Sequence, residues 1–103
     1  MSRAAKLDRA SKVEPRSHVE PPGAIDSIAL AINDRGQVAG WYDDAQGNTH
    51  GFLYYRGVWT TIDPPGSQGS EVTAIDDNGV ISGDYVGTDG NSHGFIGTPN
   101  AAE

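Results

Sequence analysis

Apolar and polar residues alternate along this chain in short runs, and turn sequences rich in Gly, Asn, Asp and Pro separate these runs. The alternation has the period of a β-strand, and Ile and Val, which favour strands, outnumber the scarce Leu. The pattern therefore predicts an all-β protein. In the first half of the chain the predicted strands cover residues 27–32, 37–42, 49–55 and 58–62.

The pattern repeats after 43 residues. Aligning residues 20–53 with 63–96 requires no gap and gives 15 identities in 34 positions. A period of about 40–45 residues is typical of one four-stranded propeller blade, and such a unit cannot bury its apolar faces alone. The sequence thus predicts two four-stranded antiparallel units that resemble propeller blades, with the passage between them at Pro64 and Pro65.

The second unit ends after its third strand, near residue 96, and the missing strand has a counterpart at the other end of the chain. Residues 16–23 align with 59–66, so we expect the N-terminal strand to complete the last blade. Two units cannot close a ring, so we expect a homo-oligomer, with a trimer favoured over a dimer or tetramer. The predicted organisation is a basic flexible tail, 1–16, and a two-blade β domain, 17–103, with units at about 24–66 and 67–103 plus 17–23.

The formal charge of −7 is unevenly distributed. Residues 1–16 carry a net charge of +3, and residues 17–103 carry −10. The strong negative charge of residues 17–103 argues against binding to nucleic acid or to an anionic membrane surface. The chain has no Cys, which excludes disulfides and thiolate metal sites. We predict no signal peptide and no membrane span, and the compartment stays open.

Three motifs together resemble the bacterial HAF repeat family. They are Ala-Ile-Asn-Asp-x-Gly-x-Val-x-Gly at 31–40, His-Gly-Phe-Leu-Tyr at 50–54 and Thr-Thr-Ile-Asp-Pro-Pro-Gly at 60–66. The resemblance covers about residues 17–97. It implies a propeller-like array and an extracellular location, and it provides no catalytic residue.

His50 and His93 occupy equivalent positions, so a ring of metal ligands around a symmetry axis is one interpretation. The interpretation that we favour is structural, with each imidazole bonded to a neighbouring strand or to the Asp or Asn of a turn. The acidic loops at 43–48 and 89–91 lack the Glu of a calcium-binding loop, and Asx-turn chemistry explains their composition. We therefore expect no metal and no cofactor.

The sequence holds no nucleophile elbow, no Cys nucleophile and no phosphate-binding glycine loop, and no pair among its many acids stands out as catalytic. We therefore expect no enzyme and no catalytic residue, a glycosidase being the least favoured alternative. Large aromatics rimmed by Asp and Asn favour a recognition scaffold with a carbohydrate ligand. The other alternative is a purely structural array fragment without a ligand. The candidate ligand-binding residues are Trp41, Trp59, Asp84 and Tyr55.

Overall fold

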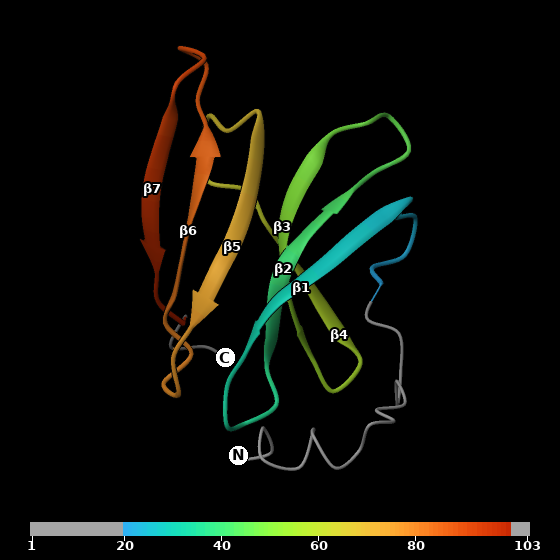
Figure 1. Cartoon of the computed structure of the whole chain (residues 1–103), viewed down its shortest axis with the longest axis vertical. Helices are drawn as coiled ribbons and strands as arrows, with labels where there is room; N and C mark the ends of the chain where they lie inside the picture. The colour runs from blue at the N-terminus through green and yellow to red at the C-terminus, as the bar shows by residue number, and fades with distance from the viewer. Residues whose placement is uncertain (1–19, 100–103) are drawn as a thin grey trace, which may run out of the picture.

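The computed structural model describes residues 20–99. The predicted tail and most of the predicted N-terminal strand, residues 1–19, lie outside these described residues. Residues 20–99 form two antiparallel β-sheets, one of four strands and one of three, and no helix (Figure 1). The prediction of an all-β protein is confirmed. This part of the chain accordingly has no helix long and apolar enough to cross a membrane.

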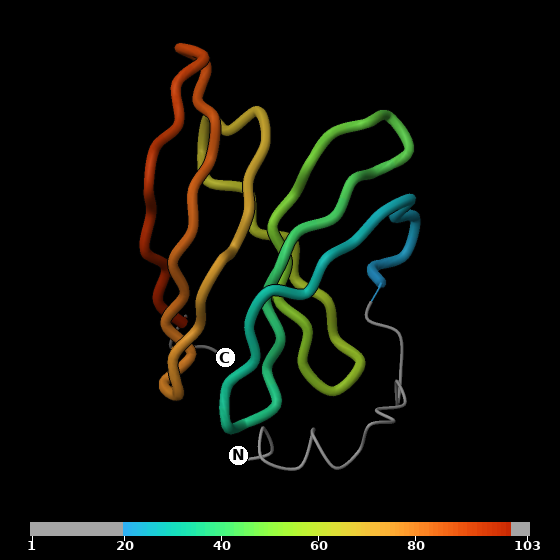
Figure 2. Tube along the Cα trace, viewed as in Figure 1, coloured from blue at the N-terminus to red at the C-terminus, as the bar shows by residue number. Residues whose placement is uncertain are grey.

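Each sheet is a series of hairpins in chain order. The first sheet has the order β1-β2-β3-β4, and the second has the order β5-β6-β7. The strands are β1 (Asp26–Ile32), β2 (Val38–Asp43), β3 (Thr49–Tyr55), β4 (Val58–Ile62), β5 (Gly69–Ile75), β6 (Ile81–Val86) and β7 (Ser92–Gly97). The trace crosses once from the first sheet to the second, through residues 63–68, as the two prolines predict (Figure 2).

The two sheets share one internal design. Each has a register shift in its first strand, after Ala29 in β1 and after Val72 in β5, and a glycine, Gly40 or Gly83, lies opposite it. A Cβ atom at Gly40 would lie 1.9 Å from the carbonyl oxygen of Ile28, and one at Gly83 would lie 2.0 Å from the equivalent oxygen. No side chain fits there. The repeated glycine is therefore a requirement of the bulge.

Alternation along the strands gives the first sheet two different faces. The aromatic face carries Val38, Tyr42, His50, Phe52, Tyr54 and Trp59. The packed face carries Ala39, Trp41, Gly51, Leu53 and Ile62. On the aromatic face Phe52 is only 1% exposed, and its ring contacts those of Tyr42 and Trp59 at centroid distances of 6.4 and 5.4 Å. The first sheet thus covers this phenyl ring with its own side chains.

The second sheet also has two faces, and one of them packs against the packed face of the first sheet. That inner face carries Ser70, Val72, Ile81, Tyr85, His93 and Phe95. The outer face carries Ser82, Asp84, Gly94 and Ile96. The core between the sheets is formed by Ala39, Val72 and Ile81, with Leu53, Ile62, Ile75 and Phe95 packed around it.

The two sheets are stacked with the same orientation. The inner face of the second sheet is the sequence equivalent of the aromatic face of the first, yet it packs against the other face of the first sheet, the packed face. Equivalent turns also contact each other. The Asn33 side chain donates to the Asp76 carbonyl oxygen at 2.9 Å, and the Asp34 backbone N–H donates to Asp77 Oδ1 at 2.9 Å. In both bonds the partners are 43 residues apart. The interface is therefore heterologous, with one kind of face meeting the other.

Candidate functional site

The imidazole of His50 joins two carboxylates at the end of the first sheet where β4 leaves for the second. Its Nε2 lies 2.9 Å from Asp44 Oδ2, and its Nδ1 lies 3.0 Å from both carboxylate oxygens of Asp63. Asp44 follows β2 and Asp63 follows β4, whereas His50 lies within β3 between them. The imidazole thus connects β3 to the segments that follow β2 and β4 by side-chain hydrogen bonds.

The electrostatics of this bridge favour a charged imidazole. Burial acts to lower the pKa of His50, but the hydrogen bonds to Asp44 and Asp63 outweigh it and raise the pKa above its ordinary value. The bond from His50 and the backbone N–H of Asn48 lower the pKa of Asp44 to about 2. With both ring nitrogens protonated, His50 can donate to both carboxylates at once.

Ser70 connects the same cluster to the second sheet. Its hydroxyl accepts a hydrogen bond from the Gly51 backbone N–H at 3.0 Å and donates toward the Ile62 carbonyl oxygen at 2.8 Å and Asp63 Oδ1 at 3.1 Å. Gly51 and Ile62 are directly paired in the β3–β4 ladder. Ser70, only 1% exposed, therefore inserts its hydroxyl between the backbones of the other sheet, and this position makes it structural.

The second sheet keeps the histidine but changes its partners. His93 Nε2 lies 3.1 Å from Asp89 Oδ2, and Asp89 also accepts from the Asn91 backbone N–H at 2.9 Å. These bonds lower the pKa of Asp89, with the Asn91 bond as the larger cause. By alignment the residue equivalent to Asp44 is Gly87, so the carboxylate has moved two residues along the loop. Within the described residues no carboxylate contacts Nδ1 of His93.

The predicted bonding of the two histidines to Asp residues of the neighbouring turns is confirmed. The Asx-turn interpretation of the acidic loops is confirmed too, since Asp44 Oδ1 accepts from the backbone N–H groups of Gln46 and Asn48, each at 2.9 Å. Among residues 20–99 no group of three or more His, Cys, Asp or Glu side chains is arranged to hold a metal ion. Chemically, the bridge can fix loop ends and respond to pH.

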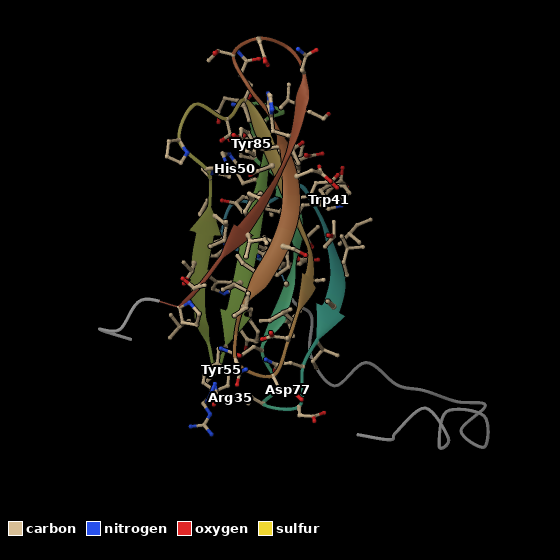
Figure 3. All side chains as sticks on the ribbon, turned by 90° about the vertical axis from the view of Figure 1, so that its left-hand side faces the viewer. Arg35, Trp41, His50, Tyr55, Asp77 and Tyr85 are labelled. Carbon is tan, nitrogen blue, oxygen red and sulfur yellow. The ribbon has the colours of Figure 1, made fainter. Side chains whose placement is uncertain are left out.

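The four candidate ligand-binding residues do not come together. Trp41 lies on the packed face of the first sheet and Trp59 on its aromatic face, where its ring is 4.5 Å from that of Tyr54. Asp84 is exposed on the outer face of the second sheet. Tyr55 lies at the far end of β3, and Figure 3 shows it at the opposite end of the molecule from Trp41 and His50.

Tyr55 does line a groove. This Tyr55 groove has a volume of about 850 Å³, and its lining includes three turn regions, those between β1 and β2, β3 and β4, and β5 and β6. The side-chain donors and acceptors in its lining include Arg35, Gln37, Arg56 and Asn78. The Arg56 guanidinium lies over the Tyr55 ring, 5.0 Å from its centroid. Figure 3 shows Arg35 and Tyr55 at the same end.

A second groove lies between β4 and the open side of the second sheet. Its volume is about 630 Å³, and its apolar lining includes Leu53, Ile81, Tyr85 and Phe95. In the first sheet the residue equivalent to Phe95 is Phe52, which Trp59 of the fourth strand covers. The second sheet has no fourth strand among the described residues, so this β7 groove lies where such a strand would place its side chains.

No family model, no curated protein and no solved structure matches this chain. Its function has to be argued from the site alone. Sequence reasoning missed the Ser70 insertion and the Tyr55 groove, because both depend on how the sheets pack. The clue that it could have used is the identity of Ser27 and Ser70 in the first half of a strand, where the neighbouring positions diverge.

Proposed function

We propose that this chain is a non-enzymatic recognition scaffold that assembles into a closed, propeller-like homo-oligomer. The single observation that carries the proposal is the heterologous stacking of two equivalent sheets, because such stacking can repeat from copy to copy and forms a ring when its rotation closes. A trimer, with six sheets, is the favoured assembly, and a dimer or tetramer would give four or eight.

The open edge of β7 supports the proposed closing strand. β3 pairs with β4 in the first sheet, whereas β7 is an outer strand among the described residues. Residues 16–20 align with 59–63, and the β7 groove offers space for their side chains. The described N-terminal end lies on the far side of the molecule from β7 (Figure 1), which favours donation of this strand to another copy.

Deleting residues 1–20 tests the closing strand. We expect the truncated chain to lose its discrete oligomeric mass and to become monomeric or to aggregate, since the edge of β7 is left unpaired. Light scattering coupled to size exclusion measures this directly. An oligomer of unchanged mass after the deletion would rule out the strand donation.

The proposed ligand is a carbohydrate, and the Tyr55 groove is the surface that fits it best. It combines a half-buried tyrosine with guanidinium and amide groups, and aromatic rings together with polar hydrogen-bonding groups are typical of ligand pockets. We expect binding on a glycan array to be lost in Tyr55→Ala and kept in Trp41→Ala. Loss with Trp41→Ala alone would place the site on the packed face instead.

The alternative is a structural array fragment without a ligand. The scatter of the four candidate residues over three faces and one end favours it. If the wild-type oligomer is intact and binds no sugar on glycan arrays, this alternative would be supported over recognition.

A further inference from the structure

The two unpaired faces of the molecule are the two halves of the interface that it already contains. The aromatic face of the first sheet is equivalent to the inner face of the second, and the outer face of the second is equivalent to the packed face of the first. We propose that the outer face of the second sheet in one copy binds the aromatic face of the first sheet in the next copy, in the geometry of the internal interface. This inference rests on the proposed function and specifies which faces meet between copies in the proposed oligomer.

Exposure of apolar residues points to both faces. Ile96 on the outer face is 75% exposed, whereas its equivalent Leu53 packs against the core. Ile32, which shares a face with Val38, is 63% exposed, whereas its equivalent Ile75 packs against the same core. Each exposed residue thus has an equivalent whose apolar side chain is partly buried against the core. The two exposed residues lie on the two faces that the interface would cover.

The glycines show which backbone regions would meet. A Cβ atom at Gly51 would lie 3.0 Å from Val72 Cγ2 and 3.4 Å from the Val72 backbone nitrogen. A Cβ atom at the equivalent Gly94 would have only one neighbour within 4 Å, the Gly83 carbonyl oxygen at 3.8 Å. Gly94 is therefore dispensable within one copy. Against a second copy it would face Ala29, the equivalent of Val72, and the backbone at Ala29 would limit the room there.

Disulfide cross-linking tests the contact. The chain has no native Cys, so any disulfide has to form between the introduced cysteines. In the full chain we introduce Gly94→Cys together with Ala29→Cys and oxidise mildly with copper phenanthroline. We expect covalent oligomers from the double variant and none from either single variant, because a heterologous interface brings together two different residues. The internal control is Gly51→Cys with Val72→Cys, which should cross-link within one chain and leave its mass unchanged.

A steric variant provides a second, independent measurement. Gly94→Tyr should reduce the mass of the wild-type oligomer to that of one chain, 10.8 kDa, while leaving the fold intact. Thr88→Tyr, in the exposed β6–β7 loop, is the matched control and should leave the assembly unchanged. Similarly, Ile32→Thr should weaken the assembly, whereas Leu30→Thr should not, since the equivalent of Leu30 is the exposed Thr73.

The outcomes separate the two proposals. The face contact would be overturned, and the scaffold proposal would stand, if two results came together. The first is a Gly94→Tyr variant that keeps the mass of the wild-type oligomer. The second is a Gly94→Cys, Ala29→Cys variant that forms no covalent oligomers while the internal control does cross-link. Cross-linking of Gly94→Cys to itself would show a two-fold interface and would overturn it as well. A wild-type chain that is monomeric at all concentrations would overturn both proposals.

Discussion

The two sheets of this molecule have almost the same internal design and quite different surroundings. Their strand registers, their bulges and the glycines opposite those bulges are equivalent. Leu53 nevertheless packs against the core while its equivalent Ile96 is 75% exposed, and His50 has two carboxylate partners where His93 has one. Local sequence therefore determines each sheet, and the stacking of the sheets determines which of its apolar side chains, such as Leu53, are packed.

The largest effect is expected where the two sheets are alike. Gly40→Ala and Gly83→Ala should each lower the free energy of unfolding by on the order of 3 kcal/mol or more, since the new methyl group would overlap a backbone carbonyl oxygen in both. Urea denaturation of both variants checks this. A tolerated change at either position would contradict the equivalence of the two bulges.

The next effect should separate the sheets. Gly51→Val should cost about 1–3 kcal/mol of unfolding free energy, because its side chain has to displace Val72 from the core. Gly94→Val should cost the fold almost nothing, since the position is open in a single copy. Thermal and urea unfolding of the two variants, at concentrations where each is monomeric, provide the comparison, and equal losses would mean that the environments of the two glycines within one chain do not differ.

A smaller loss is expected at the hydroxyl that joins the sheets. Ser70→Ala should lower the free energy of unfolding by about 1–2 kcal/mol, because the Gly51 N–H loses its buried acceptor. Ser82→Ala, on the outer face of the second sheet, is the control and should change little. Urea denaturation measures both, and a neutral Ser70→Ala would show that the inserted hydroxyl does not stabilise the packing.

The smallest effect should depend on pH. The folded state raises the pKa of His50, so its contribution is fully present below the ordinary value of 6.5 and is lost as the pH rises through the raised pKa. His50→Gln should therefore reduce stability more at about pH 6 than at about pH 9. Urea midpoints at the two pH values measure this, with His93→Gln as the control for a single carboxylate partner. A pH-independent loss would contradict the charged bridge.

The sequence predicted most of the local structure. The bounds of β3 and β4 agree with the prediction, those of β1 and β2 differ by one residue, and the proline-rich segment does join the two sheets. Period-two alternation places Val38, Gly40 and Tyr42 on one face, as the strand pairing shows. These features depend on neighbours along the chain or across one hairpin, which a single sequence records.

The arrangement of the faces could not be predicted in the same way. Alternation says which residues share a face, but it does not say which sheet covers that face. The difference between Trp41 and Asp84 illustrates this, because Trp41 lies on the face that the second sheet packs against, whereas Asp84 lies on an outer face. The partner of the second histidine could not be predicted either. The residue aligned with Asp44 is Gly87, and His93 instead bonds to Asp89, two residues further along the loop.

The central claim is that the stacking of equivalent sheets continues between copies of the chain. Its most direct test is the absolute mass of the full chain in solution, by light scattering coupled to size exclusion. The account predicts a discrete multiple of 10.8 kDa, three chains being favoured, at every concentration above the dissociation constant. A well-folded species of 10.8 kDa that does not associate at any concentration would contradict it.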